Sequence, residues 1–171
     1  RSEEGMWNEL SERRKKSCVS RCVWAGSATQ LPVPDSSIDY IFVDPPFGAN
    51  IPYSELNFLW ESILGVFTDN KFDAVQSSIL NKSLSDYQAD MESSFCEFLR
   101  VLKPGRWITV EFHNSKNAVW TSIQEALMRA GFVIADVRVL DKKQVSFKQA
   151  TTTGAVKQDL VITAYRPNGG L

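Results

Sequence analysis

The sequence has little of what metal sites require. Its 171 residues include three cysteines and one histidine. Cys18 and Cys22 have the spacing of half a zinc site, but Cys96 and His113 are the only other thiol and imidazole groups in the chain. We therefore predict reduced thiols and no metal.

Long apolar runs and a strong charge bias are also absent. No run approaches the roughly 20 residues of a membrane-spanning helix, and no charged-then-apolar leader opens the sequence. We expect no membrane association and a cytoplasmic location. The 19 basic and 20 acidic residues nearly balance, whereas a stand-alone DNA-binding protein is usually more basic.

The apolar pattern predicts one α/β domain. Residues 1–20 are expected to form a polar helix or a linker. In the rest, the order is strand, helix, strand, helix and then two strands without a helix between them, which predicts a mostly parallel sheet that ends in an antiparallel hairpin. The expected strands are 21–25, 38–43, 106–113, 132–140 and 159–166, and the expected helices are 53–64, 84–102 and 119–130.

Two local features refine this prediction. Ser85 and Gln88 have the spacing of a capping box for the helix over 84–102. Four tryptophans stand at apolar-periodic positions and are expected in the core: Trp24, Trp60, Trp107 and Trp120.

The stretch "DYIFVDPPF" contains the most informative residues. The strand over 38–43 is apolar on both faces, which is typical of a strand buried in a parallel sheet. It runs directly into Asp44, Pro45, Pro46 and Phe47. The two prolines stiffen the turn and have no N–H. The turn therefore offers two acceptors, the Asp44 carboxylate and the Pro45 carbonyl, beside the flat face of Phe47.

Two rigid acceptors beside an aromatic plane suit a flat ring that carries an NH₂ group. The nitrogen of such an amine is a poor nucleophile because its lone pair is delocalised into the ring. Acceptors that hold both hydrogens favour a more tetrahedral nitrogen, whose lone pair can point at an electrophile. A base from a duplex must first leave the stack, and an aromatic platform offsets part of that cost.

The sequence "DPPF" after an apolar strand resembles the catalytic motif of S-adenosylmethionine-dependent DNA amino-methyltransferases, in which Asp, Asn or Ser precedes Pro-Pro and an aromatic residue. The resemblance extends to "AGSATQLPVPDSSIDYIFVDPPFG", "FLRVLKPGRWITVEFHN" and "DLVITAYRP". Together these segments cover roughly residues 22–167.

The resemblance implies a Rossmann-like methyltransferase sheet, with the catalytic half over 21–167 and a tail over 168–171. It implies that Asp44 and Pro45 hold the target amine, that Pro46 shapes the turn, and that Phe47 stacks on the flipped base. Asp44 would also lie near the cofactor, S-adenosylmethionine. Ser27 stands where the family often has Asp near the adenosine.

Two residues at the end of the strand over 106–113 are further candidates. His113 is expected to point into the same crevice and to contact the cofactor. Asn114 either contacts cofactor or substrate, or caps the next helix.

One departure from the family is large. The glycine-rich turn that binds the cofactor, Phe-x-Gly-x-Gly, has no counterpart in this sequence. We therefore expect an incomplete sheet without the cofactor-motif strands, in a chain that opens at Arg1 as a piece of something longer. The remaining part of the same methyltransferase would hold the main cofactor site, this piece alone would be inactive, and its open sheet edge would favour self-association.

Two further sets of residues are candidates for substrate contact. Asn50 and Tyr53 either line the base pocket or begin the next helix. The basic residues between the last two strands either contact DNA phosphate or form a solvated hairpin loop; they include Lys142, Lys143 and Lys148.

The resemblance implies a site-specific DNA methyltransferase that acts on an exocyclic amine, as in restriction–modification. Asp in the first motif position favours adenine N6 over cytosine N4. Two alternatives stay open: a methyltransferase of RNA or protein-glutamine amines, and an inactive methyltransferase-like module that binds nucleic acid or a partner chain.

Overall fold

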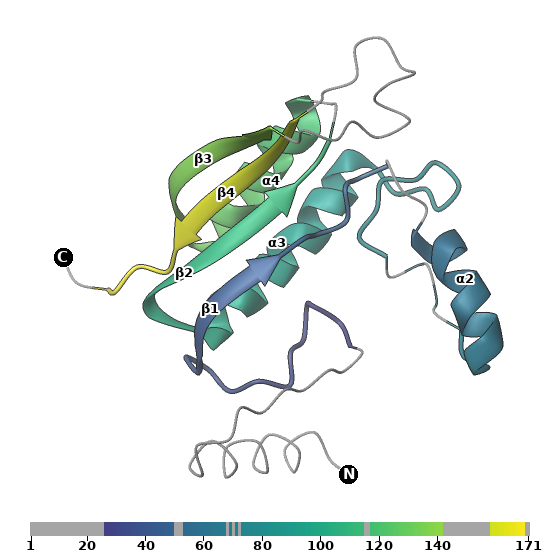
Figure 1. The fold of residues 1–171 in the computed structure, drawn as a ribbon, viewed down its shortest axis with the longest axis horizontal. Coiled ribbons are helices and arrows are strands. Elements are labelled where there is room, and N and C mark those ends of the chain that lie inside the picture. The colour runs from purple at the N-terminus through teal and green to yellow at the C-terminus, as the bar shows by residue number, and fades with distance from the viewer. Residues whose placement is uncertain are drawn as a thin grey trace.

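The computed structural model describes the central part of the chain and its seven helices and strands (Figure 1). The described residues are 26–49, 53–67, 69, 71, 73–114, 117–141 and 158–169. Residues 1–20, predicted as a polar helix or a linker, and the predicted strand over 21–25 lie outside them. In chain order the elements are β1 (Ile38–Val43), α2 (Tyr53–Leu64), α3 (Leu84–Val101), β2 (Leu102–Phe112), α4 (Asn117–Ala130), β3 (Val133–Asp141) and β4 (Gln158–Tyr165).

The four strands form one sheet in the order β1-β2-β4-β3. β1 pairs parallel with β2, and β4 pairs antiparallel with both β2 and β3. The α/β class and the C-terminal antiparallel hairpin are therefore confirmed. In the described part of the chain, the parallel portion of the sheet is the single β1–β2 pairing, and β1 is an edge strand.

The N-cap of helix α3 is Ser83, two residues before the predicted cap Ser85. Ser83 has extended backbone angles, and its side chain accepts a hydrogen bond from the Asp86 N–H while the Asp86 carboxylate accepts one from the Ser83 N–H. The capping box is therefore Ser83–Asp86, and the predicted pair Ser85–Gln88 is wrong. At its other end the helix passes directly into β2 at Leu102, four residues before the predicted start of that strand.

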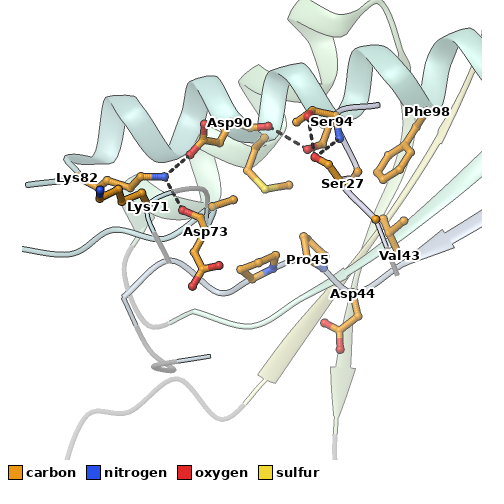
Figure 2. Close-up of a pocket in the computed structure, with 16 residues that line it drawn as sticks. Ser27, Val43, Asp44, Pro45, Lys71, Asp73, Lys82, Asp90, Ser94 and Phe98 are labelled. Atoms are coloured by element: carbon orange, nitrogen blue, oxygen red, sulfur yellow. Dashed lines mark hydrogen bonds and ion pairs between the residues drawn. The ribbon is translucent and has the colours of Figure 1, made fainter. Parts of the chain in front are cut away.

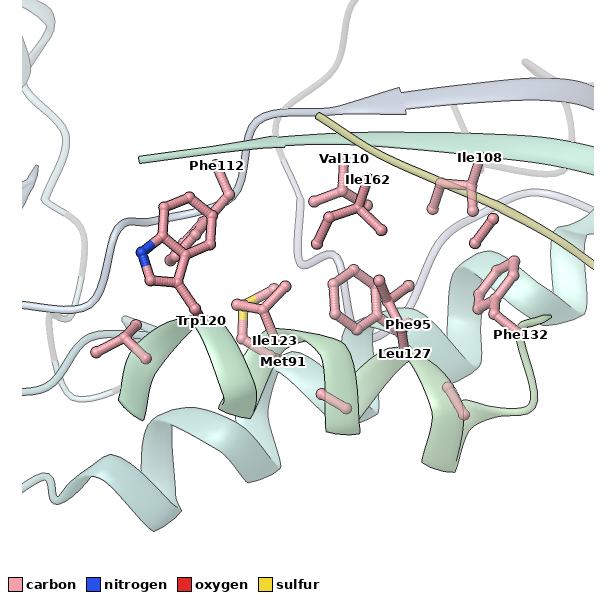
Figure 3. Packing of buried hydrophobic residues seen from close by; sticks show 14 of the residues in the cluster. Met91, Phe95, Ile108, Val110, Phe112, Trp120, Ile123, Leu127, Phe132 and Ile162 are labelled. Carbon is pink, nitrogen blue, oxygen red and sulfur yellow. The ribbon is translucent and has the colours of Figure 1, made fainter. Parts of the chain in front are cut away.

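Helices α3 and α4 cover one face of the sheet, which we call the helix face (Figure 1). Strand β2 alternates, so that Ile108, Val110 and Phe112 lie on the helix face and are fully buried. They pack with Phe95 of α3 and with residues of α4 in one cluster (Figure 3). This core fixes the position of the carboxyl ends of β1 and β2.

The opposite face, which we call the open face, carries exposed aromatic residues. Tyr40 and Phe42 of β1 are 55% and 58% exposed, and Trp107 of β2 is 42% exposed. The Tyr40 hydroxyl donates to Thr109 Oγ1 at 2.7 Å, so both strands present this face together. The prediction that β1 is buried on both faces is therefore wrong, because helices cover only one of them in the described part of the chain.

Helix α2 forms where predicted but does not bury its apolar stripe. It has no buried residue, and Leu56, Leu59, Trp60 and Ile63 are all more than 60% exposed. Of the tryptophans predicted in the core, Trp60 and Trp107 are exposed, Trp120 is buried, and Trp24 lies outside the described residues.

None of the helices described here is both long enough and apolar enough to cross a membrane.

A matched pair of phenylalanines tests where the core lies. Phe95 is fully buried in α3, and Phe58 is 61% exposed in α2. Replacing Phe95 by Ala leaves a cavity and should lower the free energy of unfolding by about 3–5 kcal/mol, whereas Phe58→Ala should change it by about 0.5 kcal/mol or less. Urea unfolding followed by circular dichroism measures both, and equal losses would contradict the proposed packing.

Candidate active site

The Asp44–Phe47 turn follows β1 at the carboxyl edge of the sheet. Pro45 is buried, and Asp44 is exposed. Figure 2 shows Val43 and Asp44 on opposite sides of the strand. Because Val43 packs on the helix face, the Asp44 carboxylate lies on the open face and is not turned into the protein interior.

Three side chains from three different parts of the chain hold this turn. The Tyr87 hydroxyl of α3 donates to the Pro46 carbonyl at 2.6 Å, and the Asn114 Nδ2 donates to the Phe47 carbonyl at 2.8 Å. The Phe47 N–H donates to the Tyr53 hydroxyl of α2 at 3.3 Å. The carbonyls of residues 46 and 47 thus accept hydrogen bonds from the chain itself.

The two tyrosines act here as neutral phenols. Burial raises the pKa of Tyr87 far above its usual range, and nearby Tyr53 raises it further. Burial also raises the pKa of Tyr53; the N–H of Phe47 opposes this effect, and the Asp44 carboxylate adds to it. Both hydroxyls therefore keep their protons at neutral pH, so Tyr87 remains a donor.

Phe47 is half-buried and connects the turn to the core. Its ring meets Phe112 edge-on, with centroids 5.4 Å apart, and the His113 ring at 6.0 Å. The ring position is therefore set by contacts with two residues at the end of β2.

Gly48 completes the turn in a conformation that favours glycine. Its φ is +68°, and an added Cβ would lie 3.3 Å from Asn114 Nδ2 and 3.4 Å from Val119 Cγ1. A larger residue would therefore press on the same Asn114 side chain that holds Phe47.

A cavity of about 540 Å³ opens beside the turn. Ser27, Asp44 and Pro45 line it, together with Met91 and Phe98 of α3 (Figure 2). The structure thus brings together Ser27 and Asp44, two of the three residues predicted from sequence to lie near a cofactor; the third, His113, does not line this cavity.

At one end of this cavity lies the charged side chain of Lys82, which makes two contacts with the protein. Lys82 Nζ donates to the Asp73 carbonyl at 2.6 Å and contacts Asp90 Oδ2 at 3.0 Å (Figure 2). The cavity therefore has a polar end at Lys82 and an apolar wall at Met91 and Phe98.

A second cavity, of about 360 Å³, lies on the α2 side of the turn. Gly48, Tyr53 and Glu55 are among the residues that line it. Tyr53 also begins α2, so both roles considered for this residue are compatible with the structure.

His113 does not line the larger cavity. Its ring contacts Asp159. Its Nδ1 lies 2.5 Å from Oδ1 of Asp159, the second residue of β4, whose side chain is 4% exposed. Asn114 is buried, and its Nδ2 donates to the Phe47 carbonyl.

Several predicted site residues lie outside the described residues, namely Asn50, Lys142, Lys143 and Lys148. Within the part of the chain that is described, no group of three or more His, Cys, Asp or Glu side chains is arranged to hold a metal ion.

The sequence did not reveal the roles of Tyr87, Asn114 and Asp159. Tyr87 follows the helical apolar spacing and reads as core, and Asp159 reads as the start of a strand. Their contacts with residues 46, 47 and 113 span more than 40 positions, and local patterns carry no signal for such contacts.

Gly48→Ala tests how tightly the turn is packed, and Gly65→Ala is its control. Both glycines have nearly the same φ, +68° and +66°, but Gly65 has nothing within 4 Å of an added Cβ. Both variants should lose about 1–2 kcal/mol of unfolding free energy from the left-handed backbone. Gly48→Ala should lose about 1 kcal/mol more from overpacking. Urea unfolding decides, and equal losses would show that the turn is loosely held.

No protein-family model and no curated protein matches the sequence. Solved structures do match. Two are of a "putative DNA modification methylase" from Thermus thermophilus: one has a TM-score of 0.52 at 14% identity, and the other 0.50 at 13%. The aligned regions cover 85% and 86% of this chain but only 53% and 54% of the two Thermus chains.

This likeness concerns the fold alone, and the chain spans about half the length of the structures that it matches. The edge position of β1 agrees with an incomplete sheet. The chain therefore has part of the Rossmann-like α/β fold of these methyltransferase structures.

Proposed function

We propose that this chain is the catalytic half of an S-adenosylmethionine-dependent methyltransferase of exocyclic amines, with DNA as its substrate. The observation that carries the proposal is the Asp44–Phe47 turn. Its carboxylate is exposed at the end of a parallel strand, its carbonyls at 46 and 47 are held by Tyr87 and Asn114, and a cavity opens beside it. The resemblance of "DPPF" to the family motif supports the same assignment.

In this proposal the turn aligns the amine. The Asp44 carboxylate and the Pro45 carbonyl accept the two N–H hydrogens, and the ring of the base lies against Phe47. Because Tyr87, Asn114 and Tyr53 fix the backbone that follows Pro45, the two acceptors keep their separation as the nitrogen becomes tetrahedral. The rate gain comes from this alignment and from negative charge beside a developing positive charge.

The larger cavity fits the cofactor's adenosine. Its volume of about 540 Å³ is within the range of roughly 300–1,000 Å³ that small-ligand pockets occupy. Met91 and Phe98 offer an apolar wall to a purine ring, and the Ser27 hydroxyl offers a hydrogen bond. When bound, the cofactor supplies an electrophilic methyl group on a sulfonium.

The rest of the cofactor site would lie in another part of the same methyltransferase. The sequence has no glycine-rich turn of the Phe-x-Gly-x-Gly kind, and β1 is an edge strand of the described sheet, where a further strand could pair. We expect this chain alone to bind the cofactor weakly and to be inactive.

Adenine N6 of DNA is the target that we favour, because Asp stands first in the motif. The likeness in fold to a DNA modification methylase supports DNA as the substrate. RNA and protein-glutamine amines, and a binding module without activity, are the outcomes that the following experiment separates.

Asp44→Asn in the longest reading frame that contains this chain tests the assignment, with Asp39→Asn as its control. Both carboxylates are exposed and belong to the same strand segment, but Asp39 pairs with Lys103 at 2.9 Å, away from the turn. Transfer of tritiated methyl from S-adenosylmethionine to DNA should fall by about 10²-fold or more in Asp44→Asn and stay nearly unchanged in Asp39→Asn.

The position of the label decides among the alternatives. Label on DNA adenine that depends on Asp44 supports the proposal. Label on RNA or protein alone moves the assignment to those substrates, and no label on any of the three leaves only a binding module.

A further inference from the structure

We propose that His113, oriented by Asp159, accepts the proton that the amine loses during methyl transfer. This inference rests on the proposed function. His113 is the only histidine in the sequence. Its Nδ1 lies 2.5 Å from the Asp159 carboxylate, the Asp159 side chain is 4% exposed, and the His113 side chain is 27% exposed. A buried acid thus holds an imidazole that substrate can still reach.

The contact with Asp159 determines which ring nitrogen is available. An ionised carboxylate can only accept hydrogen bonds, so the Nδ1 of a neutral His113 must carry the hydrogen that it donates. The hydrogen is then absent from Nε2, which keeps its lone pair. Nε2 is the nitrogen on the side of the ring away from Asp159, and it is therefore the proton acceptor.

His113 lies on the same face of the sheet as Asp44. Strand β1 is in parallel register with β2, with Val43 opposite Val110. In β4, Leu160 lies opposite Phe112 and packs against the core on the helix face. Because side chains alternate along a strand, the preceding residue, Asp159, points to the open face, and the His113 ring contacts it there. Asp44 also lies on the open face (Figure 2).

Phe47 connects the two residues. Its ring centroid is 6.0 Å from that of His113, and Phe47 is the platform proposed for the base.

Methyl transfer requires an acceptor for one proton, and the His113–Asp159 pair can provide it. As the new N–C bond forms and the S–C bond of the cofactor breaks, the amine nitrogen becomes cationic. It must release one proton before its lone pair can rejoin the ring. Nε2 of His113 takes that proton, directly or through one water, and the imidazolium charge lies against Asp159 until the exposed ring edge returns the proton to solvent. Asp44 remains an ionised acceptor throughout.

The first test is spectroscopic and does not depend on activity. Because the chain has one histidine, a long-range ¹H–¹⁵N spectrum of the imidazole is assigned without ambiguity. We expect the Nδ1–H tautomer at pH 8. In Asp159→Asn, the amide would donate to Nδ1, and the tautomer should change to Nε2–H. An Nε2–H tautomer in the wild-type protein would overturn the proposal.

The second test is kinetic, in the longest reading frame. In His113→Asn, the side-chain amide can take the place of the Nδ1 donor to Asp159 but cannot accept the proton. Its single-turnover rate of methyl transfer should fall by about 10²-fold, with cofactor affinity and Tm unchanged. Added imidazole should raise the methyl-transfer rate of His113→Ala by about tenfold. It should leave the rate of Asp44→Asn unchanged.

The outcomes separate this inference from the proposed function. Transfer that depends on Asp44 but stays within about threefold of wild type in His113→Asn, or a loss in His113→Ala that imidazole does not restore, overturns the role of His113 alone. A wild-type protein that methylates no amine overturns both proposals.

Discussion

The geometry of the proposed site depends on the hydrogen bonds that hold the turn after β1. Two prolines limit the backbone at residues 45 and 46, and hydrogen bonds from Tyr87 and Asn114 fix the two carbonyls that follow. These side chains come from α3 and from the end of β2, and both elements are anchored in the same buried cluster. The core therefore determines where the Asp44 carboxylate lies.

The two faces of the sheet have different roles in this account. The helix face holds the core and borders the larger cavity, which Met91 and Phe98 of α3 line. The open face carries Asp44 and the His113–Asp159 pair at its carboxyl edge, with exposed Tyr40 and Phe42 behind them. Cofactor and amine would thus approach the strand end from opposite sides and meet at Asp44 and Pro45.

The sequence predicted the kinds of elements better than their surroundings. Apolar spacing located α2, α3, α4 and all four described strands, because periodicity records which face of an element is apolar. It does not record whether a second layer covers that face. Trp60 and Trp107 were for this reason expected in the core, although both are exposed.

Short sequence patterns also could not identify the N-cap of α3 or the residues that hold the Asp44–Phe47 turn. Ser83–Asp86 and Ser85–Gln88 have the same spacing, and only the extended backbone at Ser83 distinguishes them. At the site, the unusual composition of Asp44–Phe47 was visible in the sequence. The donors that hold it, Tyr87 and Asn114, were not, since they come from distant segments whose own patterns suggest core and cap.

The most direct measurement is a crystal structure of the longest reading frame that contains this chain, bound to S-adenosylhomocysteine and an adenine-containing oligonucleotide. The account predicts a flipped base against Phe47, with its amine within hydrogen-bond distance of the Asp44 carboxylate and the Pro45 carbonyl. A base bound elsewhere, or an Asp44 carboxylate turned away from the amine, would contradict it.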